Sequence, residues 1–179
     1  SSLSGLVTES VTLSVTGTGF FGGVGIPDAG AVLKDEQGIQ PDIIPAGVKA
    51  SSDSQAGGII IPAGAPSARY NLFVYNSGGK SAETITYDEM VNRLAATTQS
   101  GFGASLYIPA GALTKNTAIR FADRSKDAGV KAANERPYAD IILPGDWNNN
   151  TVEVSPVDAS AQIAAGKAAN LTMKWQSAP

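Results

Sequence analysis

The sequence predicts a mainly β protein, an immunoglobulin-like or jelly-roll β-sandwich with one short helix near residues 87–98. Short runs rich in β-branched and aromatic residues recur along the chain, and clusters of glycine, proline, asparagine and serine separate them. In the second half of the chain these runs follow one another at a spacing of roughly 8–12 residues, which is typical of β-sandwiches and β-barrels. A chain of 179 residues can bury a core without a disulfide or a metal.

The first sixteen residues alternate between apolar and hydroxyl-bearing side chains. Odd positions hold most of the apolar residues, and serine and threonine hold most of the even ones. Because successive side chains of a strand point to opposite faces, this segment predicts an amphipathic strand or a pair of them.

Gly17 to Gly22 spell G-x-G-x-x-G directly after this apparent strand. In a dinucleotide-binding turn a helix begins at the last glycine, so that its N-terminal N–H groups face the pyrophosphate. Residues 23–30 contain three glycines and a proline, and each of these costs about 1–3 kcal/mol in a helix interior. The glycines are therefore interpreted as the end of a strand, and no nucleotide cofactor is predicted.

Glycines and prolines interrupt residues 17–54, which favours short strands and surface loops over helices. The run at residues 68–79 then predicts a strand followed by a turn. The sequence Ile-Pro-Ala-Gly occurs at residues 44–47, 61–64 and 108–111. Proline fixes φ and glycine admits a positive φ, so each copy predicts a turn between strands.

One segment has the pattern of a helix. Residues 86–89 have the spacing of a capping box, and Ser100-Gly101 would stop the helix. The apolar residues between these signals fall on one helical face: Tyr87, Met90, Val91 and Leu94. After this helix, strands are predicted in the runs ASLYIPAG, TAIRFAD, YADIILPG, TVEVSPV and ANLTMKWQS.

The charge balance excludes several functions. The formal net charge is −3 and only 16% of the residues are charged, so no basic surface is expected for nucleic acid. No apolar run approaches the roughly 20 residues that a membrane span needs. Low charge combined with abundant small polar residues is typical of secreted β-proteins and of coat or filament subunits.

The chain contains no histidine and no cysteine, which removes the commonest general base and the commonest metal ligands. Asp146, Asn148 and Asn150 begin like a calcium loop. However, Thr151 stands where the loop needs glycine, and Val157 stands where it needs a bidentate glutamate. We therefore predict a protein that is not an enzyme, with no catalytic residue, no metal and no cofactor.

The two ends of the chain carry a family resemblance. Residues 163–170, with their Ala-Gly-Lys turn, lead into alternating Leu171, Met173 and Trp175. This segment resembles the C-terminal signature of chaperone-usher fimbrial subunits, in which the last strand borders an open groove. The first residues resemble the N-terminal extension of these subunits, with Gly5 as the small residue among larger ones. The absence of cysteine matches the non-classical branch of the family.

The resemblance implies an immunoglobulin-like sandwich that lacks one strand. A neighbouring subunit's extension would fill the gap by strand addition, and the head-to-tail contact would build a fibre. Residues 1–16 would be the donated extension and residues 17–179 a single sandwich domain. The donor residues would be Leu3, Gly5, Val7, Val11 and Leu13, and the acceptor groove would contain Leu171, Met173 and Trp175.

The resemblance also implies partners and a location. The partners would be identical subunits, a periplasmic chaperone, an outer-membrane usher, and a host glycan or protein receptor. We expect export to the cell surface, with the start at Ser1 following removal of a secretory signal.

Two alternatives stay open at this point. The first is a viral or phage coat or decoration protein with a jelly-roll fold, which shares the low charge and the strand pattern. The second is a carbohydrate-binding module, in which Tyr75 or Trp147 would stack on a sugar.

Overall fold

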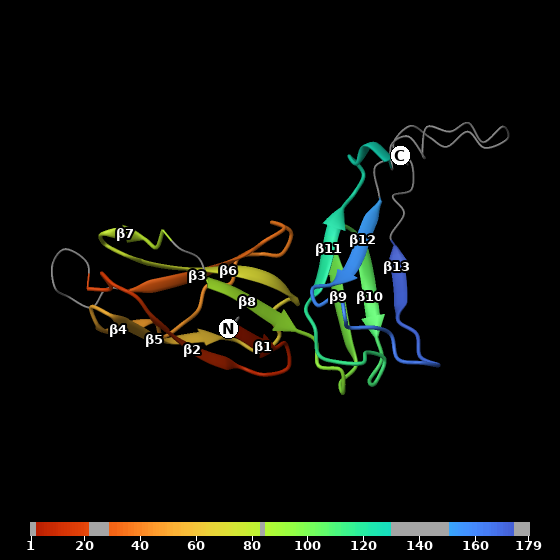
Figure 1. The fold of residues 1–179 in the computed structure, drawn as a ribbon, viewed down its shortest axis with the longest axis horizontal. Helices are drawn as coiled ribbons and strands as arrows, with labels where there is room; N and C mark the ends of the chain where they lie inside the picture. Colours follow the sequence, from red (N-terminus) through yellow and green to blue (C-terminus); the bar gives the residue numbers. More distant parts are fainter. Residues whose placement is uncertain (1–2, 22–28, 83–84, 130–150, 174–179) are drawn as a thin grey trace.

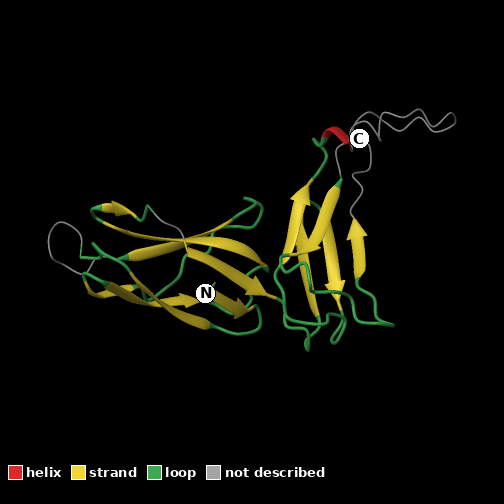
Figure 2. Ribbon diagram, viewed as in Figure 1, coloured by secondary structure: helices red, strands yellow, loops and turns green. Residues whose placement is uncertain are grey.

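The computed structural model describes residues 3–21, 29–82, 85–129 and 151–173, which form thirteen strands in two lobes (Figure 1). Strands β1 to β8 build the first lobe and β9 to β13 the second. Apart from a short helical stretch at residues 128–129, the described residues are strand and loop (Figure 2). No helix among them is long and apolar enough to cross a membrane. The mainly β fold class is confirmed.

One sheet of the first lobe has the order β1-β8-β6-β3, with the short β7 paired to β6. β1 runs parallel to β8, and the other pairs are antiparallel. The strands are β1 (Leu3–Leu6), β3 (Gly30–Asp35), β6 (Ala68–Asn76), β7 (Gly79–Lys80) and β8 (Ile85–Met90).

The facing sheet has the order β2-β5-β4, with antiparallel pairing throughout. Its strands are β2 (Val11–Thr16), β4 (Lys49–Ser52) and β5 (Gln55–Ile61). The inward residues of both sheets alternate with outward ones and form one apolar cluster, in which Leu33, Ile59 and Tyr70 are fully buried.

The topology of the first lobe is that of an immunoglobulin-like sandwich. The chain crosses between the sheets after β1, β2, β3 and β5, which gives Greek-key connections. At the start of β6 the Tyr70 hydroxyl donates a hydrogen bond to the Pro66 carbonyl oxygen at 2.9 Å. This is the tyrosine corner of such domains, a tyrosine that bonds back to the backbone a few residues upstream.

The predicted helix at residues 87–98 is wrong. β8 ends at Met90, and β9 begins at Thr97. Tyr87, Glu89 and Val91 are buried while the residues between them are only partly so, which is the two-residue period of a strand. β8 pairs with β6 on one side and β1 on the other, and this tertiary pairing overrides the local capping signal.

The second lobe contains a three-stranded and a two-stranded sheet, with the orders β13-β10-β9 and β11-β12. A second apolar cluster, which includes Ile108 and Phe121, lies between them. The buried residues thus form two clusters, one in each lobe, whereas a single sandwich was predicted for residues 17–179. The strands are β9 (Thr97–Gly101), β10 (Ala104–Ile108), β11 (Ile119–Asp123), β12 (Val152–Pro156) and β13 (Asn170–Met173).

A buried polar network joins the two lobes. The Ser67 hydroxyl donates to the Glu89 carbonyl oxygen and accepts from the Ile119 N–H, both at 2.8 Å. The Ser67 N–H donates to Gln99 Oε1 at 3.0 Å. Thr117, which pairs with Val91, is also buried. Because these buried groups hold one another, the network fixes how the first lobe meets the second.

Two copies of the Ile-Pro-Ala-Gly motif, at residues 61–64 and 108–111, end in turns, as predicted, whereas the copy at 44–47 ends in a bend. The glycines of all three copies have positive φ, at 75° for Gly47, 86° for Gly64 and 72° for Gly111. An L-residue rarely adopts this conformation, so glycine at these positions lets the chain reverse between strands. The glycines after β2 likewise follow the end of a strand at Thr16.

Candidate functional site: an apolar groove in the second lobe

The two sheets of the second lobe leave a groove of about 300 Å³ between them. β10 and β13 form one wall, and β11 and β12 form the other. The groove is lined mainly by Leu106, Ile108, Ile119, Val154, Ile163 and Leu171.

Strand register places these side chains. Leu106 of β10 pairs with Leu171 of β13, so both point to the same face of their sheet. One end of the groove is closed by two loops, which meet where Leu113 pairs with Ile163. Backbone hydrogen bonds from the Thr114 N–H to the Gln162 oxygen and from the Ala164 N–H to the Ala112 oxygen hold these loops together, at 2.9 Å each.

The groove is apolar yet partly open to solvent. Leu171 is 49% exposed and Ile163 is 46% exposed. No lining residue is charged, and Ser155 and Gln162 are the polar ones. Removing such an apolar surface from water is favourable in free energy. An uncharged apolar ligand therefore fits the groove better than a charged one.

Two strand edges border the groove. Among the described residues β13 pairs only with β10, and β12 pairs only with β11. An unpaired strand edge presents backbone N–H and C=O groups that can bind another strand. The groove therefore combines apolar side chains with backbone groups suited to an extended peptide.

The predicted acceptor residues fall into three situations. Leu171 lines the groove as expected. Met173 is partly buried and packs against the second apolar cluster. Trp175 lies outside the described residues. Sequence reasoning missed the other walls, since nothing local connects Val154 or Ile119 with Leu171.

The predicted donor residues lie in the chain's own first lobe. Leu3 and Gly5 belong to β1, which pairs with β8, and Val7 follows β1 and is buried. Val11 and Leu13 belong to β2, which pairs with β5. Their inward alternation matches the sequence pattern, but they face their own core. The expected boundary after residue 16 therefore does not separate an extension from the sandwich, because β2 is one of its strands.

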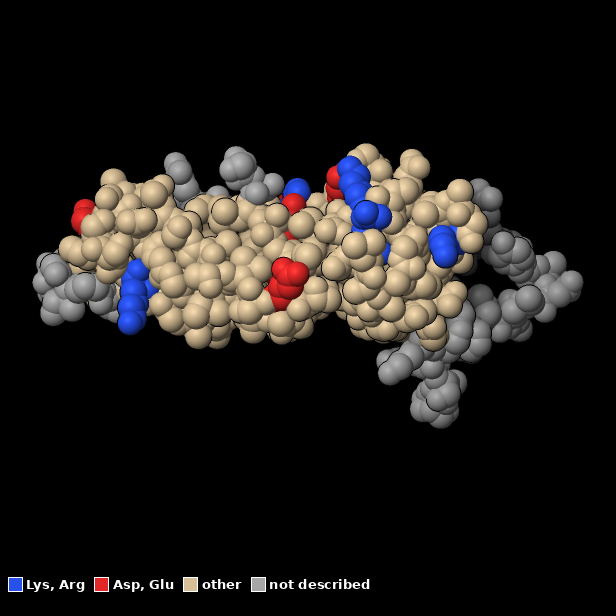
Figure 3. All heavy atoms as spheres, turned by 90° about the horizontal axis from the view of Figure 1, so that it is seen from below, with Lys and Arg blue, Asp and Glu red and all other residues tan. Residues whose placement is uncertain are grey.

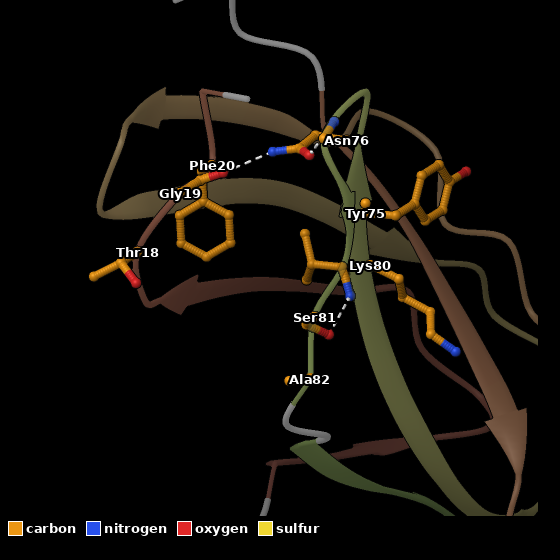
Figure 4. Close-up of a pocket in the computed structure, with 11 residues that line it drawn as sticks. Thr18, Gly19, Phe20, Tyr75, Asn76, Lys80, Ser81 and Ala82 are labelled. Atoms are coloured by element: carbon orange, nitrogen blue, oxygen red, sulfur yellow. Dashed lines mark hydrogen bonds between the residues drawn. The ribbon is translucent and has the colours of Figure 1, made fainter. Parts of the chain in front are cut away.

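A second pocket, of about 510 Å³, lies at the end of the first lobe between the Thr18–Phe20 loop and the β6–β7 hairpin (Figure 4). Two of its polar side chains, Asn76 and Ser81, make internal hydrogen bonds. Asn76 Nδ2 donates to the Gly19 oxygen at 2.7 Å, and Ser81 Oγ accepts from the Val74 N–H at 3.3 Å. Thr18, Tyr75 and Lys80 line the same pocket, so it keeps polar side chains that a ligand could contact.

Tyr75, the candidate sugar-stacking residue, points away from Phe20 in this view (Figure 4). Its ring lies across Gly30 of the neighbouring strand β3, where any side chain would overlap it. Lys80 Nζ lies 4.2 Å from the centre of the Phe73 ring. We interpret the Tyr75 ring as packing over Gly30, where the glycine leaves the surface of the sheet without a side chain. Trp147 lies outside the described residues.

Two titratable groups of the first lobe, Glu89 and Tyr87, share a hydrogen bond in its interior. Glu89 is fully buried, and burial raises the pKa of its carboxyl to about 7. The Tyr87 hydroxyl donates to Glu89 Oε2 at 2.8 Å, and burial raises the pKa of Tyr87 as well. No substrate can reach this pair from solvent. Within residues 3–21, 29–82, 85–129 and 151–173, no three acidic side chains gather to hold a metal ion.

The charged side chains are scattered over the face shown in Figure 3, which is otherwise uncharged. Lys34 pairs with Asp42 at 2.8 Å, and Arg69 pairs with Asp88 at 2.7 Å. This face has no concentrated basic or acidic surface that would select a charged partner.

The fold and the groove define a two-lobed β-protein with an immunoglobulin-like first lobe. No family model and no curated protein matches the chain. A solved structure, the extracellular portion of mouse CD200RLa, is similar at 10% sequence identity and a TM-score of 0.27, covering 97% of this chain and 98% of that one. At such a TM-score the fold assignment rests on the strand order and the tyrosine corner.

Proposed function

We propose that this chain is a structural subunit of a fibre or similar assembly on the cell surface, in which an extended strand of one copy fills the groove of the next. The observation that carries the proposal is the groove itself, which is apolar, uncharged and bordered by the edges of β12 and β13. Leu171 and Ile163, each about half exposed, both line this groove, and apolar residues that gather on one exposed surface mark a candidate contact site.

Strand addition explains both features of the groove. Backbone hydrogen bonds to a strand edge supply affinity, and alternate side chains of the added strand enter the apolar space. Burying a leucine or isoleucine completely stabilises by about 1.5–3 kcal/mol relative to leaving it exposed. Burying Leu171 and Ile163 would therefore contribute substantially to the contact.

The strand best suited to be donated is β1 of a second copy. β1 is four residues long, lies at the edge of its sheet and pairs with β8 alone among the described strands. It carries no charge, like the groove. Release of β2 would instead remove Leu13 and Val15 from the first core. Of the five predicted donor residues, the proposal therefore keeps Leu3, Gly5 and Val7 and omits Val11 and Leu13.

Donor and groove are different surfaces of the molecule, so their contact is head to tail, and it builds an open chain when the rotation between copies does not close a ring. On this proposal the subunit is exported, and a periplasmic chaperone covers the groove until an outer-membrane usher assembles the fibre. A receptor on a host cell would bind the finished fibre.

The test compares Leu171→Asp with Tyr107→Asp. Tyr107 is 43% exposed and neighbours Leu106 on β10 but does not line the groove, which makes it a matched control. A carboxylate in the groove should weaken self-association at least about 100-fold, while the control associates like the wild type. Light scattering and electron microscopy over a concentration series measure this. Equal assembly of both variants, or a wild type that is monomeric at every concentration, would overturn the proposal.

A further inference from the structure

The side chain of Glu89 lies beneath β1. In the strand register Glu89 faces Gly5 on β1 and Ala68 on β6. The side chain is 0% exposed, Oε2 accepts a hydrogen bond from Tyr87, and Oε1 has no hydrogen-bond partner. A buried carboxylate oxygen without a partner is costly, and far more so when the group is charged.

β1 closes over this site without filling it. Gly5 leaves room for the Tyr87 hydroxyl, which a side chain at position 5 would overlap. β1 itself has no titratable side chain that could pair with Glu89. Two neutral contacts hold the end of the strand, since the Val7 N–H donates to the Met90 oxygen at 2.9 Å and the Gly64 N–H donates to the Val7 oxygen at 2.6 Å.

The other elements around Glu89 supply no positive charge. The titratable groups that face it are Tyr87 on β8 and Tyr70 on β6, and burial raises the pKa of both hydroxyls, so they stay neutral. On β3, beside Tyr70, lies Asp35, an acidic residue and not a basic one. Ser67, Gln99 and Thr117 at the lobe junction are uncharged, and none of the ion pairs among the described residues includes Glu89.

We propose that the charge state of Glu89 controls β1: the protonated side chain holds β1 closed on β8, and the ionised side chain favours a state in which β1 is detached. Detachment of β1 is the smallest opening that lets water reach the carboxylate, because β6 and β8 are interior strands of the sheet. The detached β1 would be the donor strand of the proposed assembly, and this link between Glu89 and assembly rests on the proposed function. The detachment of β1 itself does not depend on that function.

The direction with pH follows from burial, which raises the pKa of Glu89 to about 7 in the closed state. Water returns the pKa toward its ordinary value of about 4.3 once β1 opens. The open state therefore gains about tenfold per pH unit between these two values and levels off above the higher one. Release increases as the pH rises.

Amide hydrogen exchange between pH 4.5 and 8.5 tests this proposal. The protection factor of the Val7 amide compares its exchange rate with the intrinsic rate at the same pH, so the direct effect of pH on exchange cancels. We expect this protection factor to fall by roughly 100-fold between pH 4.5 and 7 and then to stay level. Global unfolding also ionises Glu89, so the protection factor of the Leu13 amide on β2 should fall in parallel but stay above that of Val7 at every pH. A Val7 protection factor that does not change with pH, or one equal to that of Leu13, would overturn the proposal.

Two glutamates make a matched pair of variants. Glu89→Gln should remove the pH dependence, whereas Glu9→Gln, in the exposed turn after β1, should keep it. Tyr87→Phe serves as an independent variant, because the Tyr87 hydrogen bond lowers the pKa of Glu89. Without this hydrogen bond the pKa of Glu89 should rise, so the release of β1 should level off at a higher pH. Retained pH dependence in Glu89→Gln would contradict the proposal.

The Leu171→Asp variant separates the two proposals. If the groove accepts β1, this variant fails to assemble but its Val7 amide still responds to pH. If it assembles normally and the Val7 response persists, the groove is not the acceptor and Glu89 still controls β1. If it fails to assemble and the Val7 protection factor does not change with pH, the groove proposal stands and the control of β1 by Glu89 is wrong.

Discussion

The two lobes use the same kind of strand and differ in how they close. In the first lobe both sheets contribute inward residues, and Leu33, Ile59 and Tyr70 are fully buried. In the second lobe the sheets leave a groove, and Leu171 and Ile163 stay about half exposed. The apolar side chains of a strand thus show which face of the sheet packs inward. Whether these side chains are completely buried depends on how closely the opposite sheet packs against them.

The largest expected effect tests this difference in closure directly. Leu33→Ala should lower the free energy of unfolding by about 2–5 kcal/mol, because it opens a cavity in a closed core. Leu171→Ala should cost less than about 1 kcal/mol, since the residue loses little burial. Urea denaturation of both variants provides the measurement. If both variants lose a similar free energy of unfolding, the groove is closed in solution and the two lobes do not differ in closure.

The second prediction concerns pH, because the buried carboxylate belongs to the first lobe. Since burial raises the pKa of Glu89 to about 7, the folded state holds a proton that the unfolded state has lost. The contribution of Glu89 to stability is therefore greatest at low pH and should fall by about 3 kcal/mol between about pH 4.5 and 7. Urea denaturation at several pH values measures this fall. Glu89→Gln should lack it, and a variant with the wild-type slope would contradict the assignment.

The smallest effect contrasts one tyrosine from each lobe. Tyr70→Phe removes the hydrogen bond to the Pro66 oxygen and should destabilise by about 1 kcal/mol. Tyr107→Phe should have no measurable effect, because Tyr107 is exposed on the outside of β10. Thermal unfolding followed by circular dichroism measures both. Equal behaviour of the two variants would mean that the tyrosine corner adds nothing to the first lobe.

Sequence patterns predicted most of the strands because the relevant signals are local. The β-branched and aromatic run at residues 68–76 forms β6, and the Asn-Ser-Gly-Gly sequence after it forms a turn. The helix prediction failed because Thr86 to Glu89 carry a capping signal that is also compatible with a strand. Pairing with β1 and β6 selected the strand.

The candidate site was predictable only in part. Leu171 was named from a resemblance, and the structure places it in an apolar groove. The opposite wall comes from Val154 and Ile119, and no periodicity links these residues with Leu171. Glu89 was read only as part of a helix cap, since the sequence contains no sign that a parallel strand would cover it.

The sequence alone determined most of the extended segments, several of the turns that follow them, and the absence of histidine and cysteine, because propensity, alternation and composition are local properties of the chain. Only the tertiary structure decided that β1 lies beside β8, that the second lobe stays open, and that Glu89 is buried without a partner. Strand pairing joins residues distant in the chain, and its free energy depends on surfaces that exist only after folding.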